Sequence, residues 1–169
     1  MKNSEILQNG LRFVLLILLQ VLVLDHINFL GYINPYAYIF FILFFPLSGN
    51  KSLLIALAFL QGLIIDVFND TGGIHAAASV FIAWIRPVVL KFSFGVSYEY
   101  NTVNFGKANI SQQITYILTM VVAHHLMLFC LEIFSFKHMD LILKSTLFSS
   151  IFSLIIIHSL ILLFNRNIR

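Results

Sequence analysis

Residues 62–76 read GLIIDVFNDTGGIHA, two apolar runs that flank a short polar turn. The adjacent glycines, Gly72 and Gly73, are typical of a tight turn, so we expect a hairpin of two helices here. Asp66 lies near the end of the first helix, and His75 lies near the start of the second. The two side chains should therefore lie at a similar depth, where they can pair.

One face of the first of these helices is lined with small residues. Ala58, Gly62 and Asp66 follow one another at intervals of four, so they share a helix face. Small residues at this spacing let a neighbouring helix come close. We expect this face to point into the packed interior rather than into lipid. Two roles stay open for Asp66: a cap of the hairpin or of the next helix, and direct binding of a partner or ligand.

The whole chain is strongly apolar. Of its 169 residues, 60% are hydrophobic and 10% are charged, and the mean hydropathy is +0.95. Ordinary soluble domains carry about 25% charged residues, so this composition excludes a soluble enzyme, a disordered chain and a nucleic-acid-binding protein. The single cysteine, Cys130, excludes an internal disulfide and a cysteine-built metal site. The sequence predicts an all-α integral membrane protein with a single transmembrane domain over residues 1–169.

Six apolar stretches are candidate membrane spans. A helix needs about 20 apolar residues to cross the bilayer core, and five stretches are long enough. The other stretch, which begins at Pro35, is short and can be a tilted span, a half-span or a re-entrant segment. No small-residue cleavage site follows the first stretch, so we expect a retained span there. The expected spans are 6–24, 35–47, 52–68, 74–91, 111–134 and 141–164.

The basic residues favour six crossings. If all six stretches cross, eight basic residues fall on one side and two on the other, and the excess marks the cytoplasmic side. The larger group is Lys2, Lys51, Lys91, Lys107, Arg166 and Arg169, with Arg12 and Arg86 in adjoining helix ends; the smaller group is Lys137 and Lys144. The sequence thus predicts a six-transmembrane-helix bundle with both termini in the cytoplasm.

Arg86 is a charged residue within a predicted span, and such residues are functional candidates. It precedes Pro87 near the cytoplasmic end of its helix. Arg86 follows His75 by eleven residues, which is about 16 Å along a helix, so we expect no contact between Arg86 and Asp66. The favoured interpretation is that Arg86 snorkels to lipid headgroups. The alternative is a buried partner.

Further polar residues lie in the last two spans. His124 and His125 lie near mid-membrane, and Glu132 shares a face with His125, so these groups can hold a metal or relay a proton. Their spacing is not the His-Glu-x-x-His of a zinc helix, and hydrogen bonding between helices is the favoured interpretation. The last span also carries a seam of small polar residues that should serve helix packing. The seam consists of Thr146, Ser149, Ser150 and Ser153.

No sequence motif pairs a nucleophile with a base. The chain has no Gly-rich phosphate loop, no Gly-x-Ser-x-Gly elbow, no His-Glu-x-x-His and no cysteine cluster. We therefore predict no enzymatic activity, no cofactor and no metal. The function should depend on binding within the membrane plane or through short loops.

The stretch GLIID…GGIHA resembles the rod shape-determining protein MreD family. Similar features are the chain length, six spans with short loops, Asn34-Pro35 at the start of the second span, and an Ala-rich helix that ends in Arg86. The abundant Phe and Ile residues, together with His75, resemble members from the Bacteroidetes group. The resemblance implies a non-enzymatic scaffold subunit of the cell-elongation machinery in the bacterial inner membrane, which helps to position peptidoglycan synthesis.

The resemblance also implies partners and an alternative function. MreD-like proteins associate with MreC, a bitopic membrane protein, and directly or indirectly with MreB, RodA and a penicillin-binding protein, among membrane lipids. Their fold is similar to that of the substrate-binding subunits of energy-coupling-factor transporters. The alternative function is therefore a small-molecule-binding transport subunit, although the short outer loops of this chain favour the scaffold.

The hairpin is the expected partner site. It combines small and polar residues, as helix association in membranes requires, and it reaches the periplasmic surface. We expect it to form or brace the site that receives an MreC-like protein. The competing interpretation is that packing inside the bundle uses the same face. The residues concerned are Ala58, Gly62, Asp66, Gly72, Gly73 and His75.

Overall fold

The computed structural model shows a chain folded into helices, described for residues 3–27, 29, 31, 33–47, 49–99, 105 and 108–164. Four basic residues of the orientation count lie outside this part of the chain: Lys2, Lys107, Arg166 and Arg169. The helices of the described residues are α1 (Asn3–Leu22), η1 (Leu24–His26), α2 (Ile39–Leu43), α3 (Lys51–Asn69), α4 (Ile74–Phe94), α5 (Val96–Glu99), α6 (Ile110–Ile133), η2 (Phe136–His138) and α7 (Met139–Phe164).

Among the described residues, five helical stretches are long and apolar enough to cross a membrane: α1 continued through η1, then α3, α4, α6 and α7. Their bounds agree with five of the expected spans to within one helical turn. Large apolar side chains cover the outside of these helices, among them Leu11 and Leu18 on α1 and Leu147 and Ile155 on α7. An apolar exterior of this kind is not typical of a soluble monomer. The all-α prediction is confirmed, and the fold is compatible with a multi-pass membrane protein.

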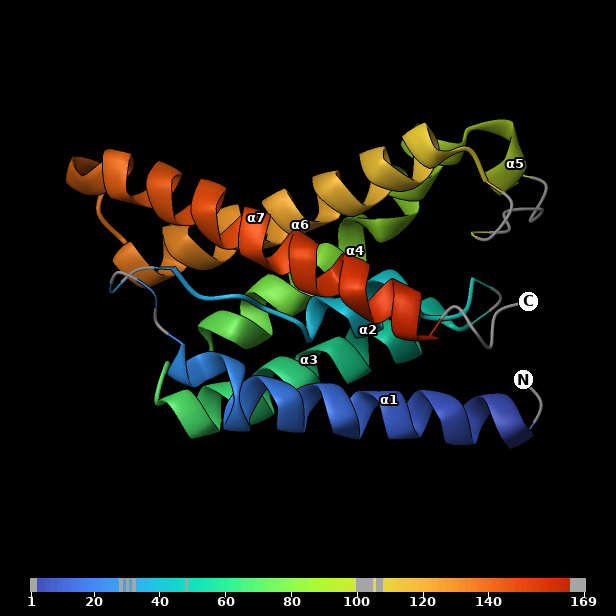
Figure 1. Ribbon diagram of the computed structural model, residues 1–169, viewed down its shortest axis with the longest axis horizontal. Helices are drawn as coiled ribbons and strands as arrows, with labels where there is room; N and C mark the ends of the chain where they lie inside the picture. Colours follow the sequence, from blue (N-terminus) through green and yellow to red (C-terminus); the bar gives the residue numbers. More distant parts are fainter. Residues whose placement is uncertain are drawn as a thin grey trace.

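Helix α4 lies in the middle of the bundle, where it packs against α3 and α6 (Figure 1). Helix α7 packs against α6, and α1 lies beside α3 and runs in the same direction (Figure 1). The start of α1 and the end of α7 lie at one end of the bundle, which we call the terminal end. The turn between α3 and α4 lies at the opposite end, which we call the hairpin end.

The expected span 35–47 is not a helix along its length. Residues 34–37 form neither helix nor strand and run as a stretched-out, extended trace (Figure 1), and in this segment only the five residues of α2 are helical. This part of the chain, which we call the crossing segment (residues 33–47), leads from the hairpin end, where η1 lies, towards the terminal end, where α3 begins (Figure 1). All residues of α2 are buried, and α2 packs against α1, α4 and α6. The described residues therefore form five of the six expected transmembrane helices, and the six-helix count is not confirmed.

The extended part of the crossing segment has side chains of α7 as hydrogen-bond partners. The backbone N–H of Asn34 donates to Ser149 Oγ at 3.2 Å, and the backbone N–H of Tyr36 donates to Ser153 Oγ at 2.8 Å. These serines belong to the polar seam that we expected to serve helix packing. Two of its hydroxyl groups also replace the hydrogen bonds that an extended backbone cannot make within itself.

Two buried glutamines provide further partners. Gln20 Oε1 accepts from the backbone N–H of Ala37 at 2.8 Å, and Gln20 Nε2 donates to the carbonyl of Pro35 at 3.1 Å. Gln61 Nε2 donates to the carbonyl of Tyr38 at 3.3 Å. Side chains from α1, α3 and α7 thus hold the extended backbone. Non-helical backbone at membrane depth is tolerated where protein groups satisfy it in this way.

Candidate functional site

Helices α3 and α4 meet through their backbones at Gly62. A Cβ atom at this position would lie 2.4 Å from Cα of Ala76, so only glycine fits without a backbone shift. Ala58 on the same face is fully buried. In the turn, Gly72 and Gly73 have φ angles of 65° and 100°, which glycine adopts readily. The predicted hairpin is formed, and its small-residue face lies inside the bundle rather than on an exposed docking surface.

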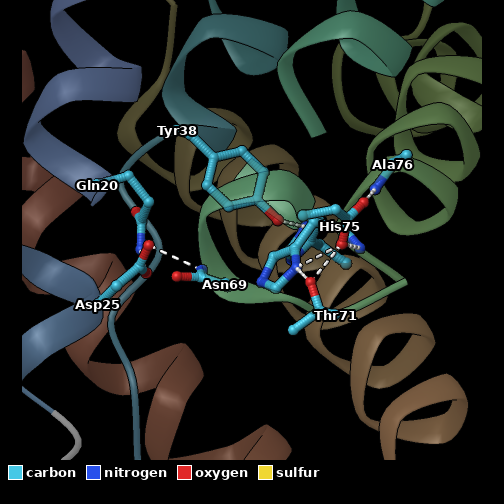
Figure 2. A network of polar contacts seen from close by, with 9 residues as sticks. Gln20, Asp25, Tyr38, Asn69, Thr71, His75 and Ala76 are labelled. Atoms are coloured by element: carbon cyan, nitrogen blue, oxygen red, sulfur yellow. Dashed lines mark hydrogen bonds and ion pairs between the residues drawn. The ribbon is translucent and has the colours of Figure 1, made fainter. Parts of the chain in front are cut away.

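Asp66 caps the start of α4. Its Oδ1 accepts from the Thr71 hydroxyl at 2.5 Å and from the backbone N–H of His75 at 2.9 Å, and its Oδ2 accepts from the backbone N–H of Ala76 at 2.8 Å (Figure 2). A helix start leaves such N–H groups without partners, and a negative charge there complements the helix dipole. Asp66 is 4% exposed. The capping interpretation is therefore confirmed.

His75 pairs with Asp66, as the position of the turn predicts. Nδ1 of His75 lies 3.0 Å from Oδ1 of Asp66 and 3.1 Å from Oγ1 of Thr71. Because an ionised carboxylate only accepts hydrogen bonds, Nδ1 carries a hydrogen. Nε2 of the same ring is buried and has no hydrogen-bond partner in the described part of the chain. The ring is thus fixed through one nitrogen while the other is left unused.

A pocket of about 210 Å³ lies beside His75 at the hairpin end. It is lined by Asp25, Asn34, Tyr36, Asn69, Thr71, Ile74, His75 and Glu132. These residues come from η1, the crossing segment, the end of α3, the turn, the start of α4 and the end of α6. All of them except Ile74 carry a polar group. Figure 2 shows the His75 ring facing the side on which Asn69 and Asp25 lie.

Two amide groups hold the carboxylate of Asp25 in the pocket wall. Its Oδ1 accepts from Gln20 Nε2 at 2.6 Å, and its Oδ2 accepts from Asn69 Nδ2 at 2.8 Å (Figure 2). Gln20 also binds the crossing segment. The wall of the pocket and the extended chain therefore belong to one hydrogen-bond network.

The two adjacent histidines of α6 lie in a buried cluster of rings. The hydroxyl group of Tyr38 is hydrogen-bonded to His124 Nε2 at 2.7 Å. His125 Nδ1 donates to the carbonyl of Val121 at 2.7 Å, and its Nε2 lies 3.0 Å from Ser153 Oγ. The expected hydrogen bonding of these histidines between elements is confirmed.

Glu132 does not join the histidines. It lies at the exposed end of α6 and lines the pocket, whereas His124 and His125 are both fully buried. Among the described residues, no three His, Cys, Asp or Glu side chains converge as metal ligands do. The residues that were candidates for one metal or proton-relay group are therefore divided between two places.

Arg86 is 5% exposed, so the snorkelling interpretation is wrong. Its Nη2 donates to the carbonyls of Phe45 at 2.5 Å and Leu43 at 3.3 Å, and its Nε donates to the hydroxyl of Tyr116 at 3.1 Å. That hydroxyl donates in turn to the carbonyl of Leu43 at 2.9 Å. Arg86 thus caps the carbonyl end of α2, where a cation is favourable. It makes no hydrogen bond with Asp66, as expected.

Six of the eight residues that line the pocket were not predicted as site residues from the sequence: Asp25, Asn34, Tyr36, Asn69, Thr71 and Ile74. The sequence did indicate that some of these residues lie at the same end of the bundle. The orientation count placed residues 25–34 and 69–73 on the same side of the membrane. That count gives a side but no direction for a side chain, so it does not predict that these groups face one another.

The described residues form a helical chain that is compatible with a multi-pass membrane protein and has a polar pocket at the hairpin end. Comparison with known proteins finds no matching family model, no matching curated protein and no matching solved structure.

Proposed function

We propose that this chain is an MreD-type scaffold subunit of the bacterial cell-elongation machinery, a non-enzymatic protein that binds an MreC-like protein. The observation that carries the proposal is the geometry of residues 62–76, the stretch that resembles the MreD family. Gly62 admits the backbone of α4, and Asp66 caps that helix. The residues that carry the resemblance therefore hold together the centre of the bundle.

The proposed location is the inner membrane, with the terminal end in the cytoplasm and the hairpin end in the periplasm. Two observations support this orientation. The described ends of the chain lie together (Figure 1), as an even number of crossings requires. The six-span reading of the sequence also assigns eight of the ten basic residues to that side, four of which lie outside the described residues. In this orientation the crossing segment is the sixth crossing. Reporter fusions after Lys51 and at Arg169 should then report the cytoplasm, and a periplasmic signal at Arg169 would contradict the proposal.

The hairpin then braces the partner site rather than forming it with its helix face. Gly62 and Asp66 are buried against α4, whereas Asp70 and Gly72 in the turn are exposed. The exposed turn is the part of the hairpin that the periplasmic region of a bitopic protein can reach. Exposed charges in such a rim act mainly on partner choice and association rate.

Co-purification tests the scaffold function directly. The tagged full chain is co-expressed with the MreC-like protein of its source bacterium and with an unrelated single-span protein as the control. We expect selective recovery of the MreC-like protein, and rounding of rod-shaped cells when the chain is depleted. Equal recovery of both proteins, with unchanged cell shape after depletion, would refute the scaffold proposal.

A matched pair of variants tests the site. Asp70→Asn removes an exposed carboxylate from the hairpin turn, at a positive φ of 54° that asparagine tolerates. Asp140→Asn removes an exposed carboxylate from the start of α7 at the same end of the bundle. Recovery of the MreC-like protein should fall several-fold with Asp70→Asn and stay unchanged with Asp140→Asn. Equal recovery with both variants would place the docking surface elsewhere.

The pocket favours a second candidate function, the small-molecule-binding subunit of an energy-coupling-factor-type transporter. Its volume of about 210 Å³ and its polar lining suit a small ligand. This function predicts a small molecule that mass spectrometry detects in the purified protein. It also predicts co-purification with an ATPase-bearing membrane complex rather than with an MreC-like protein.

A further inference from the structure

The pocket at the hairpin end carries two carboxylates and a buried acceptor atom that lacks a donor in the described part of the chain. Asp25 and Glu132 contribute two carboxylates, and Asn34 Oδ1 is a buried atom without a hydrogen-bond partner in the described part of the chain. None of the described residues that line the pocket is a lysine or an arginine. Its negative charge is therefore not balanced by a lining cation.

His75 adds a further acceptor to this pocket. Its side chain is 4% exposed, and within the described chain its buried Nε2 has no partner. The hydrogen on Nδ1 is directed at Asp66 Oδ1 at 3.0 Å. In the neutral ring, Nε2 is then an acceptor only. Among the buried side-chain polar atoms that lack a partner in the described chain, Nε2 and Asn34 Oδ1 are the two whose residues line this pocket. A donor held in the pocket would satisfy them.

The arrangement suits an organic cation better than a metal ion. A metal ion needs ligands that converge on one point, and no three His, Cys, Asp or Glu side chains of the described residues do so. An ammonium or guanidinium group carries several N–H donors that point in different directions. Such a group can reach acceptors spread over a pocket of about 210 Å³.

We propose that this pocket binds an organic cation through an ammonium or guanidinium group. The carboxylates of Glu132 and Asp25 supply the charge, and Asn34 Oδ1 and His75 Nε2 accept hydrogens from the ligand. Tyr36 adds an aromatic ring to the lining, and aromatic rings attract cations. The volume leaves room for a short alkyl chain behind the charged group.

This inference goes beyond the scaffold function and does not depend on it. The cation has two sources with the same chemistry: a free amine in the surrounding solution, or the lysine or arginine side chain of a bound partner. Both offer N–H donors on a positive group. The pocket can therefore be tested with the purified chain alone, before any partner is considered.

The first experiment compares n-butylammonium with 1-butanol, a neutral compound of similar size, at constant ionic strength. The full chain is purified in lipid nanodiscs, and its thermal unfolding midpoint is followed as each compound is titrated. A ligand that binds the folded state raises this midpoint in a saturable way. We expect such a rise with butylammonium and not with butanol. No rise with butylammonium, or the same rise with both compounds, would overturn the proposal.

A matched pair of variants localises the binding. Glu132 is exposed and makes no hydrogen bond within the described chain, so Glu132→Gln should keep the fold, which its midpoint without ligand verifies. The control is Asp140→Asn, which removes an equal charge outside the pocket. We expect Glu132→Gln to weaken butylammonium binding at least tenfold and Asp140→Asn to leave it unchanged. Unchanged binding by Glu132→Gln, or equal weakening by both variants, would overturn the assignment to this pocket.

Competition identifies the source of the cation. If a partner's basic side chain occupies the pocket, butylammonium should reduce recovery of the MreC-like protein at least several-fold, and butanol should not. If the ligand is a free amine, recovery of that protein should not change while the amine still binds. If the chain recovers no MreC-like protein at all, the scaffold proposal fails. The butylammonium titration still tests the proposal that the pocket binds an organic cation.

Discussion

At each end of the bundle a buried charged side chain caps a helix, but the pockets at the two ends differ in size. At the hairpin end Asp66 caps the start of α4, and towards the terminal end Arg86 caps the end of α2 within the crossing segment. The pocket beside Arg86 has a volume of about 20 Å³, against about 210 Å³ beside His75. A helix cap therefore explains the whole environment of Arg86, whereas at the hairpin end it leaves a pocket and buried acceptors unexplained.

This difference distinguishes a buried charge that only caps a helix from one that lies beside a candidate binding site. Both charges sit where the helix dipole favours them, so burial of a charge alone does not indicate a binding site. What distinguishes the hairpin end is that two residues lining its pocket, His75 and Asn34, carry buried polar atoms without a partner in the described chain, whereas no residue lining the pocket beside Arg86 does. Substitutions at the two ends can break or sharpen this comparison.

The largest effect is expected for Gly62→Ala at the hairpin end. The new Cβ would lie 2.4 Å from Cα of Ala76, so α3 and α4 must move apart, with a loss of about 3 kcal/mol in the free energy of unfolding. Gly10→Ala is the control, because nothing lies within 4 Å of that position and the helix gains from alanine. Denaturant unfolding of the purified protein measures both. Equal stability of the two variants would show that α3 and α4 are not in backbone contact.

Arg86→Met should have the next largest effect. It leaves the buried carbonyl of Phe45 without its donor and removes one of the two donors to Leu43, a loss of about 2–3 kcal/mol. Arg86→Lys keeps the charge and should lose about half as much. The same unfolding measurement serves for both. If Arg86→Met is as stable as the parent, the residue does not cap α2, and the contrast between the two ends disappears.

Asp66→Asn should cost about 1–2 kcal/mol, the range for a lost helix cap. The amide nitrogen cannot accept from a backbone N–H, so either His75 or Ala76 loses its partner. Asp70 in the turn after α3 is exposed. The control variant Asp70→Asn should therefore change the free energy of unfolding by less than about 0.5 kcal/mol. Thermal unfolding in detergent compares the two variants. A larger loss of stability from Asp70→Asn than from Asp66→Asn would show that Asp66 is not the residue that caps α4.

The smallest effect concerns the crossing segment, which connects the two ends. Ser153→Ala removes the acceptor for the backbone N–H of Tyr36 and the neighbour of His125 Nε2, with an expected loss of about 1 kcal/mol. Ser150→Ala is the control, because Ser150 is buried without a hydrogen-bond partner among the described residues. The two variants should differ in unfolding midpoint. Equal midpoints would mean that the α7 hydroxyls serve packing alone.

Much of the fold could be predicted from the sequence. Long apolar runs predict long helices because a membrane-spanning backbone must satisfy itself internally, and five such helices are present. The pairing of Asp66 with His75 was predictable as well, since a short turn brings the end of one helix and the start of the next to the same depth. Both inferences depend on neighbours in the sequence.

The crossing segment could not be predicted in the same way. Its apolar composition suits a helix as well as an extended chain, and the decision rests on partners far away, such as Gln20 and Ser153. The error about Arg86 has the same origin. In a continuous helix over residues 35–47 the carbonyl of Leu43 would accept from the backbone N–H of Leu47, so no contact between this carbonyl and Arg86 was expected.

The pocket could not be predicted from the sequence because its lining residues come from elements that are far apart in the chain. Asp25, Asn34 and Glu132 belong to η1, the crossing segment and α6. Sequence position places each of them near one end of the bundle. It does not give the rotation of each element about its own axis, and that rotation decides whether a side chain faces the pocket or lipid.

The extended backbone of the crossing segment has a consequence for the order of events during synthesis. Asn34 and Tyr36 donate to serines that follow them by 115 and 117 residues. An unpaired backbone group in hydrocarbon costs several kcal/mol, so this segment cannot take its final place in a bilayer when it leaves the ribosome. It must wait beside the translocation channel, at the membrane surface or in another conformation until the last helix arrives. Assembly of this protein therefore ends with its second apolar stretch, not with its sixth.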